Sequence, residues 1–226
     1  MILFVVDFLF KRKPSWAVLK EKIPFLGLAL VFGLVTLHFQ GQYHASWGLE
    51  NKISLAKRIL AASYILFTYP FKLIWPLKLS CFYPFPQIQS GSMPLIFYIM
   101  PLAACILVYF LVKFRSQRFL IFRFLFFFFN IVWVLQVLPM ENFLMADRYV
   151  YIAGAGFFLL MAGCLSYLLD RRSAYPPVFK KILFLCIVCY FVFLSLLTFE
   201  RCKVWANSEV LYNNVLQQFP QTVPVY

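Results

Sequence analysis

The residues best placed for chemistry lie in the turn at residues 137–156, VLPMENFLMADRYVYIAGAG, between two apolar stretches. It concentrates the charged residues and tyrosines Glu141, Asp147, Arg148, Tyr149 and Tyr151. Arg148 offers a planar fork of donors that suits a phosphate. Asp147 equally suits the start of a helix, as a cap or as a favourable charge, and tyrosines are common at membrane interfaces. Both interpretations, an anion site and a helix start, remain open from the residues alone.

Composition indicates what kind of fold must position this turn. Of the 226 residues, 63% are hydrophobic, 29 are Phe and only 13% are charged, whereas soluble domains average about 45–50% apolar and about 25% charged residues. A soluble fold would expose the excess as large apolar patches. The prediction is an all-α, polytopic transmembrane helix bundle. The net charge of +13 is explained by basic loops and few acids, so no nucleic-acid partner is predicted.

Length sets the number of membrane spans, because a span needs about 20 mostly apolar residues. Five stretches qualify, at residues 23–39, 93–112, 119–138, 149–169 and 182–199. Residues 1–10 are too short and lack the flanks of a signal peptide, so they are predicted to be the tail of a helix whose beginning is absent. Gly156 and Gly163 share one helix face and suit the close approach of a neighbouring helix, in the same chain or in another.

The positive-inside rule decides how residues 53–75 are placed, because this stretch is apolar but carries Lys57, Arg58, Lys72 and Pro70. If it lies along the interface, the basic loops at residues 11–22, 113–118 and 171–181 share the inner face. Residues 40–92 are therefore predicted to form one outer loop, partly an interfacial helix. The C-terminus is then extracytoplasmic.

Metal and disulfide chemistry receive little support from the sequence. His38 and His44 have no other ligand types near them, so no metal site is predicted. Cys81 and Cys202 both fall outside in this topology, which leaves a disulfide between them open.

Three segments resemble one family. MADRYVYIAGAG, residues 145–156, resembles the ADRY-x-Y-x-P-x-x-G segment of GT-C superfamily membrane glycosyltransferases with C-terminal tetratricopeptide repeats, the O-mannosyltransferase-like kind. FKLIWPLKLSCFYPFP, residues 71–86, is similar to the family's outer-loop segment. RCKVWANSEVLYNNVLQQFPQTVPVY, residues 201–226, looks like its linker and the start of its repeats. By this resemblance, residues 1–200 are the C-terminal half of the transmembrane domain. Ala153 departs from the family's usual proline.

The resemblance implies transfer of a sugar from a polyprenyl-phosphate donor to a protein or glycan acceptor at the extracytoplasmic face, without a cofactor. Arg148 would bind the leaving phosphate, flanked by Asp147 and Tyr149, and Asp147 would orient Arg148 or the helix start rather than serve as the base. Lys72 and Lys78 would help to hold the same head group. Membrane lipid is the further partner that this fold implies.

The departures from the family limit this expectation. The family's catalytic acidic residue lies in a preceding membrane half, so no catalytic residue is predicted in these residues, which we expect to be inactive alone and to need a separately encoded N-terminal half. A repeat array also needs about three units. The alternatives are a non-catalytic membrane scaffold, a degenerate remnant, or a transporter, the last weakened because the predicted spans lack paired carboxylates near their middle.

Overall fold

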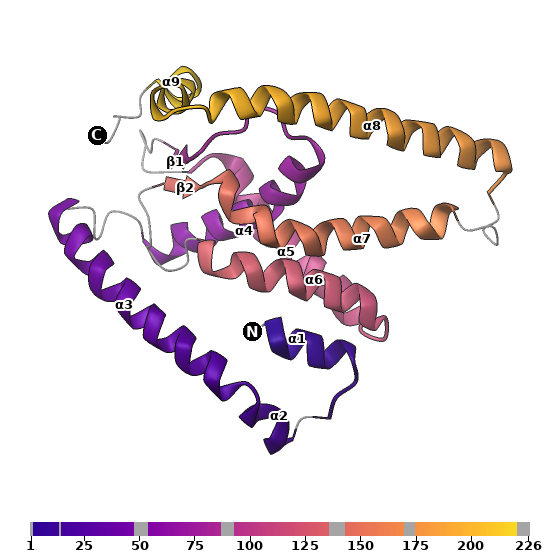
Figure 1. Cartoon of the computed structure of the whole chain (residues 1–226), viewed down its shortest axis with the longest axis horizontal. Helices are drawn as coiled ribbons and strands as arrows, with labels where there is room; N and C mark the ends of the chain where they lie inside the picture. Colours follow the sequence, from indigo (N-terminus) through magenta and orange to yellow (C-terminus); the bar gives the residue numbers. More distant parts are fainter. Residues whose placement is uncertain are drawn as a thin grey trace.

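The computed structural model describes residues 2–13, 15–47, 54–86, 93–135, 143–169 and 175–220. Most of these residues are helical (Figure 1). The α-helices are α1 (Ile2–Leu9), α2 (Trp16–Lys20), α3 (Ile23–Trp47), α4 (Leu55–Ile74), α5 (Leu95–Lys113), α6 (Arg118–Ile131), α7 (Tyr151–Leu169), α8 (Pro177–Val204) and α9 (Ser208–Gln218). Two 3-10 turns, η1 (Val132–Val134) and η2 (Asp147–Val150), and two strands, β1 (Tyr83–Pro84) and β2 (Phe143–Met145), complete the described elements.

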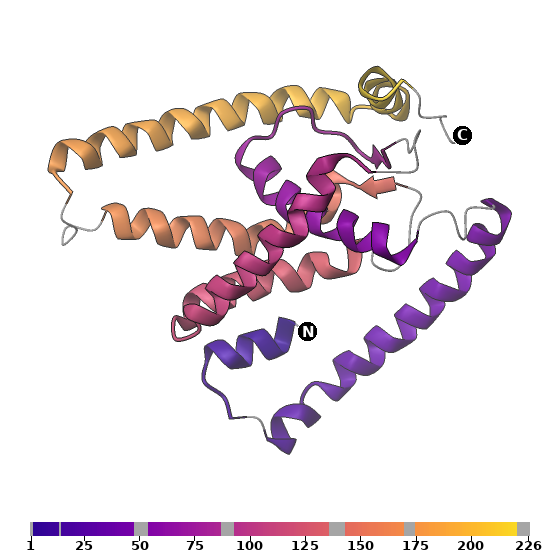
Figure 2. The same ribbon diagram turned by 180° about the vertical axis from the view of Figure 1, so that it is seen from behind.

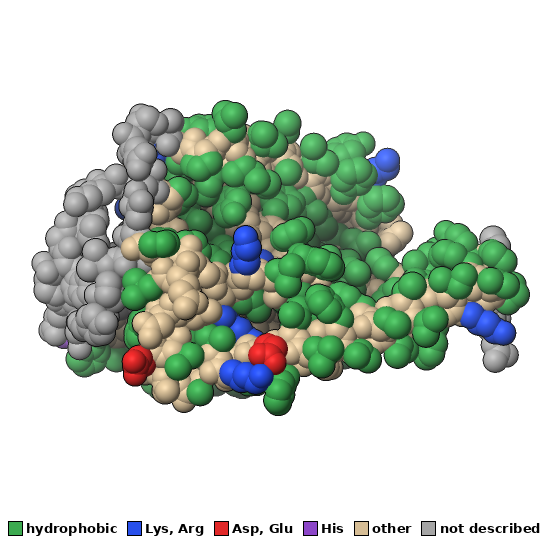
Figure 3. Space-filling view, turned by 90° about the horizontal axis from the view of Figure 1, so that it is seen from above, with side chains coloured by type: hydrophobic (Ala, Val, Ile, Leu, Met, Phe, Trp, Pro, Cys, Tyr) green, Lys and Arg blue, Asp and Glu red, His purple; other side chains and the backbone are tan. Residues whose placement is uncertain are grey.

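Three helices among the described residues are long and apolar enough to cross a membrane. They are α5 with 19 residues, η2 with α7 over 23 residues, and α8 with 28 residues. No residue of α8 is buried. Figure 3 shows apolar side chains along this helix, with charged ones gathered near its ends. The predicted membrane-protein class is therefore supported, whereas the predicted number of about five spans is not confirmed.

The other two predicted spans have different forms. In the described part of the stretch at residues 119–138, the α-helix is α6, which has 14 residues and ends at Ile131 before η1 begins. Fourteen residues rise about 21 Å, less than the roughly 30 Å of a hydrocarbon core. The stretch at residues 23–39 lies in α3, which continues to Trp47. Figures 1 and 2 show α3 diverging from the other helices.

The buried core lies where α4, α5, α6 and α7 meet. One face of α4 supplies Ala61, Ala62, Ile65 and Tyr69, whose spacing of three to four residues defines the apolar stripe of a helix. Tyr64 of α4 stacks on Phe97 of α5, with 4.4 Å between the ring centroids. The helix α4 is not among the three candidate spans, and its predicted place at the interface stays a prediction.

Helices α6 and α7 approach each other through glycine. A Cβ atom at Gly156 would lie 2.7 Å from the Phe127 backbone nitrogen and 2.8 Å from the Arg123 carbonyl oxygen. At Gly163, the space is taken by the Arg123 guanidinium. The close neighbour left open by the sequence is therefore α6 of the same chain.

The strands correct the all-α prediction in one detail. β1 pairs antiparallel with β2, with Tyr83 opposite Met145 and Pro84 opposite Phe143. The buried Tyr69 hydroxyl of α4 donates to the Ala146 carbonyl oxygen, 3.0 Å away, directly after β2. The strand pair, the start of α7 and helix α9 gather at one end of the molecule. The turn between α5 and α6 and the C-terminal end of α7 lie at the other end (Figure 1).

Candidate functional site

Asp147 joins the turn before α7 to the loop after α4. Its Oδ2 accepts a hydrogen bond of 2.7 Å from the Ser80 backbone nitrogen, and its Oδ1 accepts one of 2.9 Å from the Tyr83 hydroxyl. The residue that caps η2 is Ala146, without a side-chain cap. The Asp147 carboxylate therefore does not cap the helix, as the sequence allowed, but holds a loop more than 60 residues away. Both of its oxygens are hydrogen-bonded, as a partly buried carboxylate requires.

Tyr83 and Lys72 form the other side of this contact. Burial raises the pKa of the Tyr83 phenol, and the Asp147 charge raises it further, so the hydroxyl keeps the proton that it donates. The Lys72 ammonium lies 4.6 Å from the centroid of the Tyr83 ring and donates to the Lys78 carbonyl oxygen at 3.3 Å. Burial lowers the pKa of Lys72, although the Asp147 charge opposes this shift. Lys72 is thus a cation that gives up part of its hydration.

Lys78 contributes its backbone to this cluster, and its side chain is exposed. Its φ of 52° lies in the left-handed region, which is uncommon for a residue with a Cβ atom. Its carbonyl oxygen lies within hydrogen-bonding distance of both the Lys72 ammonium and the Tyr83 hydroxyl. The sequence predicted that the Lys78 side chain would help to hold the lipid head group, but these interactions involve only its backbone.

Arg148 lies on the exposed side of the turn, against aromatic rings. Its guanidinium carbon is 5.1 Å from the centroid of the Tyr149 ring and 5.9 Å from that of Phe143. Its Nη2 donates to the Tyr149 hydroxyl at 3.4 Å. Stacking on rings restricts a guanidinium and so orients its donors. Tyr149 is therefore placed to orient Arg148.

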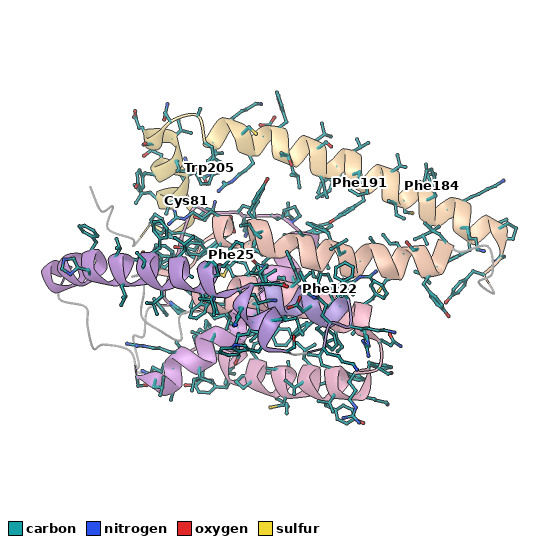
Figure 4. All side chains as sticks on the ribbon, turned by 60° about the horizontal axis from the view of Figure 1, so that its bottom comes forward. Phe25, Cys81, Phe122, Phe184, Phe191 and Trp205 are labelled. Carbon is teal, nitrogen blue, oxygen red and sulfur yellow. The ribbon has the colours of Figure 1, made fainter. Side chains whose placement is uncertain are left out.

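A cavity of about 540 Å³ opens beside this cluster. Most of its lining is apolar, and its charged residues are Asp147, Arg148 and Arg201. The lining residues are Leu73, Leu79, Asp147, Arg148, Val150, Tyr151, Gly154, Ala155, Phe158, Arg201 and Trp205. They come from the end of α4, the loop after it, η2, α7 and the end of α8 with the residue that follows it. Figure 4 shows Cys81 and Trp205 at this same end of the molecule, with Phe184 and Phe191 further along α8.

Arg201 is the residue that sequence reasoning did not assign to the site. Its Nη1 donates to Asn214 Oδ1 of α9 at 3.0 Å, and Gln218 of α9 donates to the Leu79 carbonyl oxygen at 3.0 Å. Basic residues at the end of an apolar helix usually mark the membrane boundary, so this position gave no separate signal. Its place beside Asp147 depends on how α8 packs against the loop after α4.

The two cysteines that could have paired, Cys81 and Cys202, are both free; Cys81 is buried and Cys202 is exposed. The structure thus brings together Lys72, Asp147, Arg148 and Tyr149 of the predicted site and adds Tyr83 and Arg201. Lys72 and Arg201 act on the Asp147 carboxylate and Arg148 lines the cavity beside it, so among the described residues of this cluster basic side chains outnumber acidic ones. With both carboxylate oxygens hydrogen-bonded, Asp147 is better suited to positioning than to proton transfer.

The fold defines the class of the protein as a helical membrane protein, on the strength of its three apolar helices. The chain matches no protein-family model, no curated protein and no solved structure.

Proposed function

We propose that the chain is the membrane part of a GT-C-like glycosyltransferase, which transfers a sugar from a polyprenyl-phosphate donor to a protein or glycan acceptor. The observation that carries this proposal is the convergence of three segments on one cavity. Leu73 and Leu79 come from residues 71–86, Arg148 from residues 145–156, and Arg201 and Trp205 from residues 201–226. These are the segments whose sequences resemble that family.

The chemistry of the cavity suits such a donor. Negative charge grows on the phosphate as the glycosidic bond breaks, and cations aimed at that position stabilise the transition state. Arg148 of the lining serves this role, and the partly dehydrated Lys72 adds positive charge from α4 behind it. Asp147 holds the loop after α4 against the turn of Arg148. The apolar wall, with Leu73, Gly154 and Phe158, accommodates the start of the lipid chain. By the family resemblance, the base for the acceptor hydroxyl would lie in a preceding membrane half.

The end of the molecule that carries the cavity faces the extracytoplasmic side in this proposal. The basic turn between α5 and α6 and the Lys180–Lys181 pair near the start of α8 lie toward the opposite end, as the positive-inside rule requires of cytoplasmic segments. The remaining spans of the predicted five would be α3 and α6 with η1. Helix α9 would begin the repeat region.

Thiol labelling tests this orientation. In a variant whose only cysteine is the exposed Cys202, a membrane-impermeant maleimide added to intact cells is expected to label the protein. In a second variant, whose only cysteine is introduced by Ser116→Cys in the turn between α5 and α6, labelling is expected only after permeabilisation. The opposite pattern would reverse the orientation, and labelling of both without permeabilisation would contradict the spans themselves.

Transfer activity tests the proposed chemistry. The chain is reconstituted in vesicles with a membrane half that carries the family's catalytic acidic residue, and transfer of labelled mannose from a polyprenyl-phosphate donor to a peptide is measured. We expect Arg148→Ala to lower the rate about 100-fold, because one donor to the developing charge is lost. The control is Arg115→Ala, which removes an exposed arginine from the turn between α5 and α6.

Three results would contradict parts of this proposal. Equal rates for Arg148→Ala and the unchanged chain would remove the phosphate role of Arg148. A similar loss in the Arg115→Ala control would show that overall charge, rather than the cavity, matters. Absence of transfer by a folded, correctly oriented protein would favour the membrane scaffold.

A further inference from the structure

The end of α8 holds a buried cationic nitrogen that the protein itself leaves unpaired. Nη2 of Arg201 is inaccessible to solvent and has no hydrogen-bond partner among the described residues. Nη1 of the same guanidinium donates to Asn214. A buried donor without a partner costs about 1–3 kcal/mol, a cost that is removed when the guanidinium turns to meet a ligand.

The charged residues around Arg201 indicate the sign of the charge on that ligand. Arg201 and Arg148 line the same cavity, and Lys72 lies close enough for the Arg201 charge to depress its pKa. Asp147 is the acidic residue of the lining, and its two oxygens are occupied by Ser80 and Tyr83. Among the described residues that line this cavity, two arginines face one carboxylate, and this balance favours an anion as the ligand.

The shape of the cavity indicates what the anion is attached to. Beyond the arginines the lining is apolar, with Leu73, Gly154, Ala155 and Phe158. It lies at the start of the candidate span α7 and at the end of the candidate span α8. A free phosphate would leave this apolar surface uncovered. A phosphate carrying a hydrocarbon chain would cover it and would extend toward the membrane.

We propose that Arg201 binds the phosphate of a polyprenyl phosphate in this cavity, with its buried Nη2 turning toward the cavity to donate to a phosphate oxygen and with Arg148 as a second cation of the lining. Arg201 is thus a phosphate-binding residue in addition to Arg148. The choice of a polyprenyl phosphate as the lipid rests on the proposed function. Asn214 of α9 positions the guanidinium, which makes the first turns of the C-terminal region part of the binding site.

Direct binding tests this assignment without any transfer step. The full chain is placed in nanodiscs, and binding of ³²P-labelled farnesyl phosphate, a short polyprenyl phosphate, is measured. Arg201→Gln, which keeps a side-chain donor, is expected to weaken binding about tenfold or more, as the loss of a charge-assisted hydrogen bond predicts. The matched control is Lys203→Gln, which removes an exposed cation two residues away that pairs with Glu200.

Competition identifies the source of the phosphate. Displacement by unlabelled farnesyl phosphate but not by equal concentrations of inorganic phosphate supports a lipid ligand. Displacement by both, dependent on Arg201, retains the phosphate site but assigns it to free phosphate, which overturns the lipid part. Displacement by farnesol as effectively as by farnesyl phosphate overturns the role of Arg201 in binding phosphate.

The stability of the variant is checked by its thermal unfolding. A folded Arg201→Gln protein that binds like the unchanged chain refutes the proposal. If Arg201→Gln does not fold, Arg201→Lys is used, which keeps the charge but loses the second nitrogen; severalfold weaker binding supports the proposal and unchanged binding refutes it. If binding depends on Arg201 but no sugar transfer occurs, the phosphate site is supported and the proposed glycosyltransferase activity is refuted. Arg148-dependent transfer with Arg201-independent binding would refute this inference alone.

Discussion

Asp147→Ala is expected to lower the free energy of unfolding by about 3 kcal/mol, one of the two largest losses predicted for a single side chain in this protein. The substitution leaves the Ser80 backbone nitrogen and the Tyr83 hydroxyl without the carboxylate oxygens that they contact at 2.7 and 2.9 Å. It also leaves the charges of Lys72 and Arg201 without the carboxylate on which both act. The loop between α4 and β1 should separate from the start of α7.

Two measurements test the effect of Asp147→Ala. Thermal unfolding in detergent reports the stability, and limited proteolysis reports cleavage within residues 76–86, which should become faster. Asp147→Asn keeps one acceptor and the shape of the side chain, so its loss should be smaller. Glu209→Ala removes an exposed acid from α9 at the same end of the molecule and should change neither readout. An Asp147→Ala protein as stable as the Glu209→Ala control would show that the loop is held by other contacts.

Gly156→Ala is expected to destabilise the protein by about 3 kcal/mol, at the upper end of the usual cost of overpacking. The added Cβ would lie 2.7 Å from the Phe127 nitrogen and 2.8 Å from the Arg123 oxygen, and both atoms belong to the backbone of α6. A helix backbone cannot rotate away as a side chain can, so α6 and α7 must move apart. The packing of Phe127 against Phe157, whose centroids lie 6.2 Å apart, would be lost with it.

Two control substitutions at other glycines should either stabilise the protein or destabilise it less. Gly27 of α3 has nothing within 4 Å of an added Cβ, so Gly27→Ala should stabilise its helix by about 0.5–1 kcal/mol. At Gly163 the obstacle is the end of the flexible Arg123 side chain, so Gly163→Ala should cost less than Gly156→Ala. Thermal unfolding of the three variants ranks them. A Gly156→Ala protein that is more stable than the parent would mean that α6 and α7 are not in contact there.

Some of these features could be predicted from local sequence because they need no partner far along the chain. Long apolar runs predict helices that cross lipid, since a span must satisfy its backbone internally and cover itself with apolar side chains. The run at residues 93–112 became α5, and the runs at residues 149–169 and 182–199 became α7 and α8, with the limits of α5 and α7 shifted by a few residues and those of α8 extended by up to five. The early end of α6 was not visible, because residues 132–138 continue the same apolar composition.

By itself, the sequence determined that this protein is a set of apolar helices with a charged turn at the head of one of them. Only the tertiary structure decided what that turn contacts. Asp147 reaches Ser80 and Tyr83 across 67 and 64 residues, and β2 pairs with β1 across a similar distance. The position of Arg201 beside them follows from the packing of α8. Composition and periodicity report which face of an element is apolar, whereas hydrogen bonds between distant polar side chains depend on how whole helices are placed.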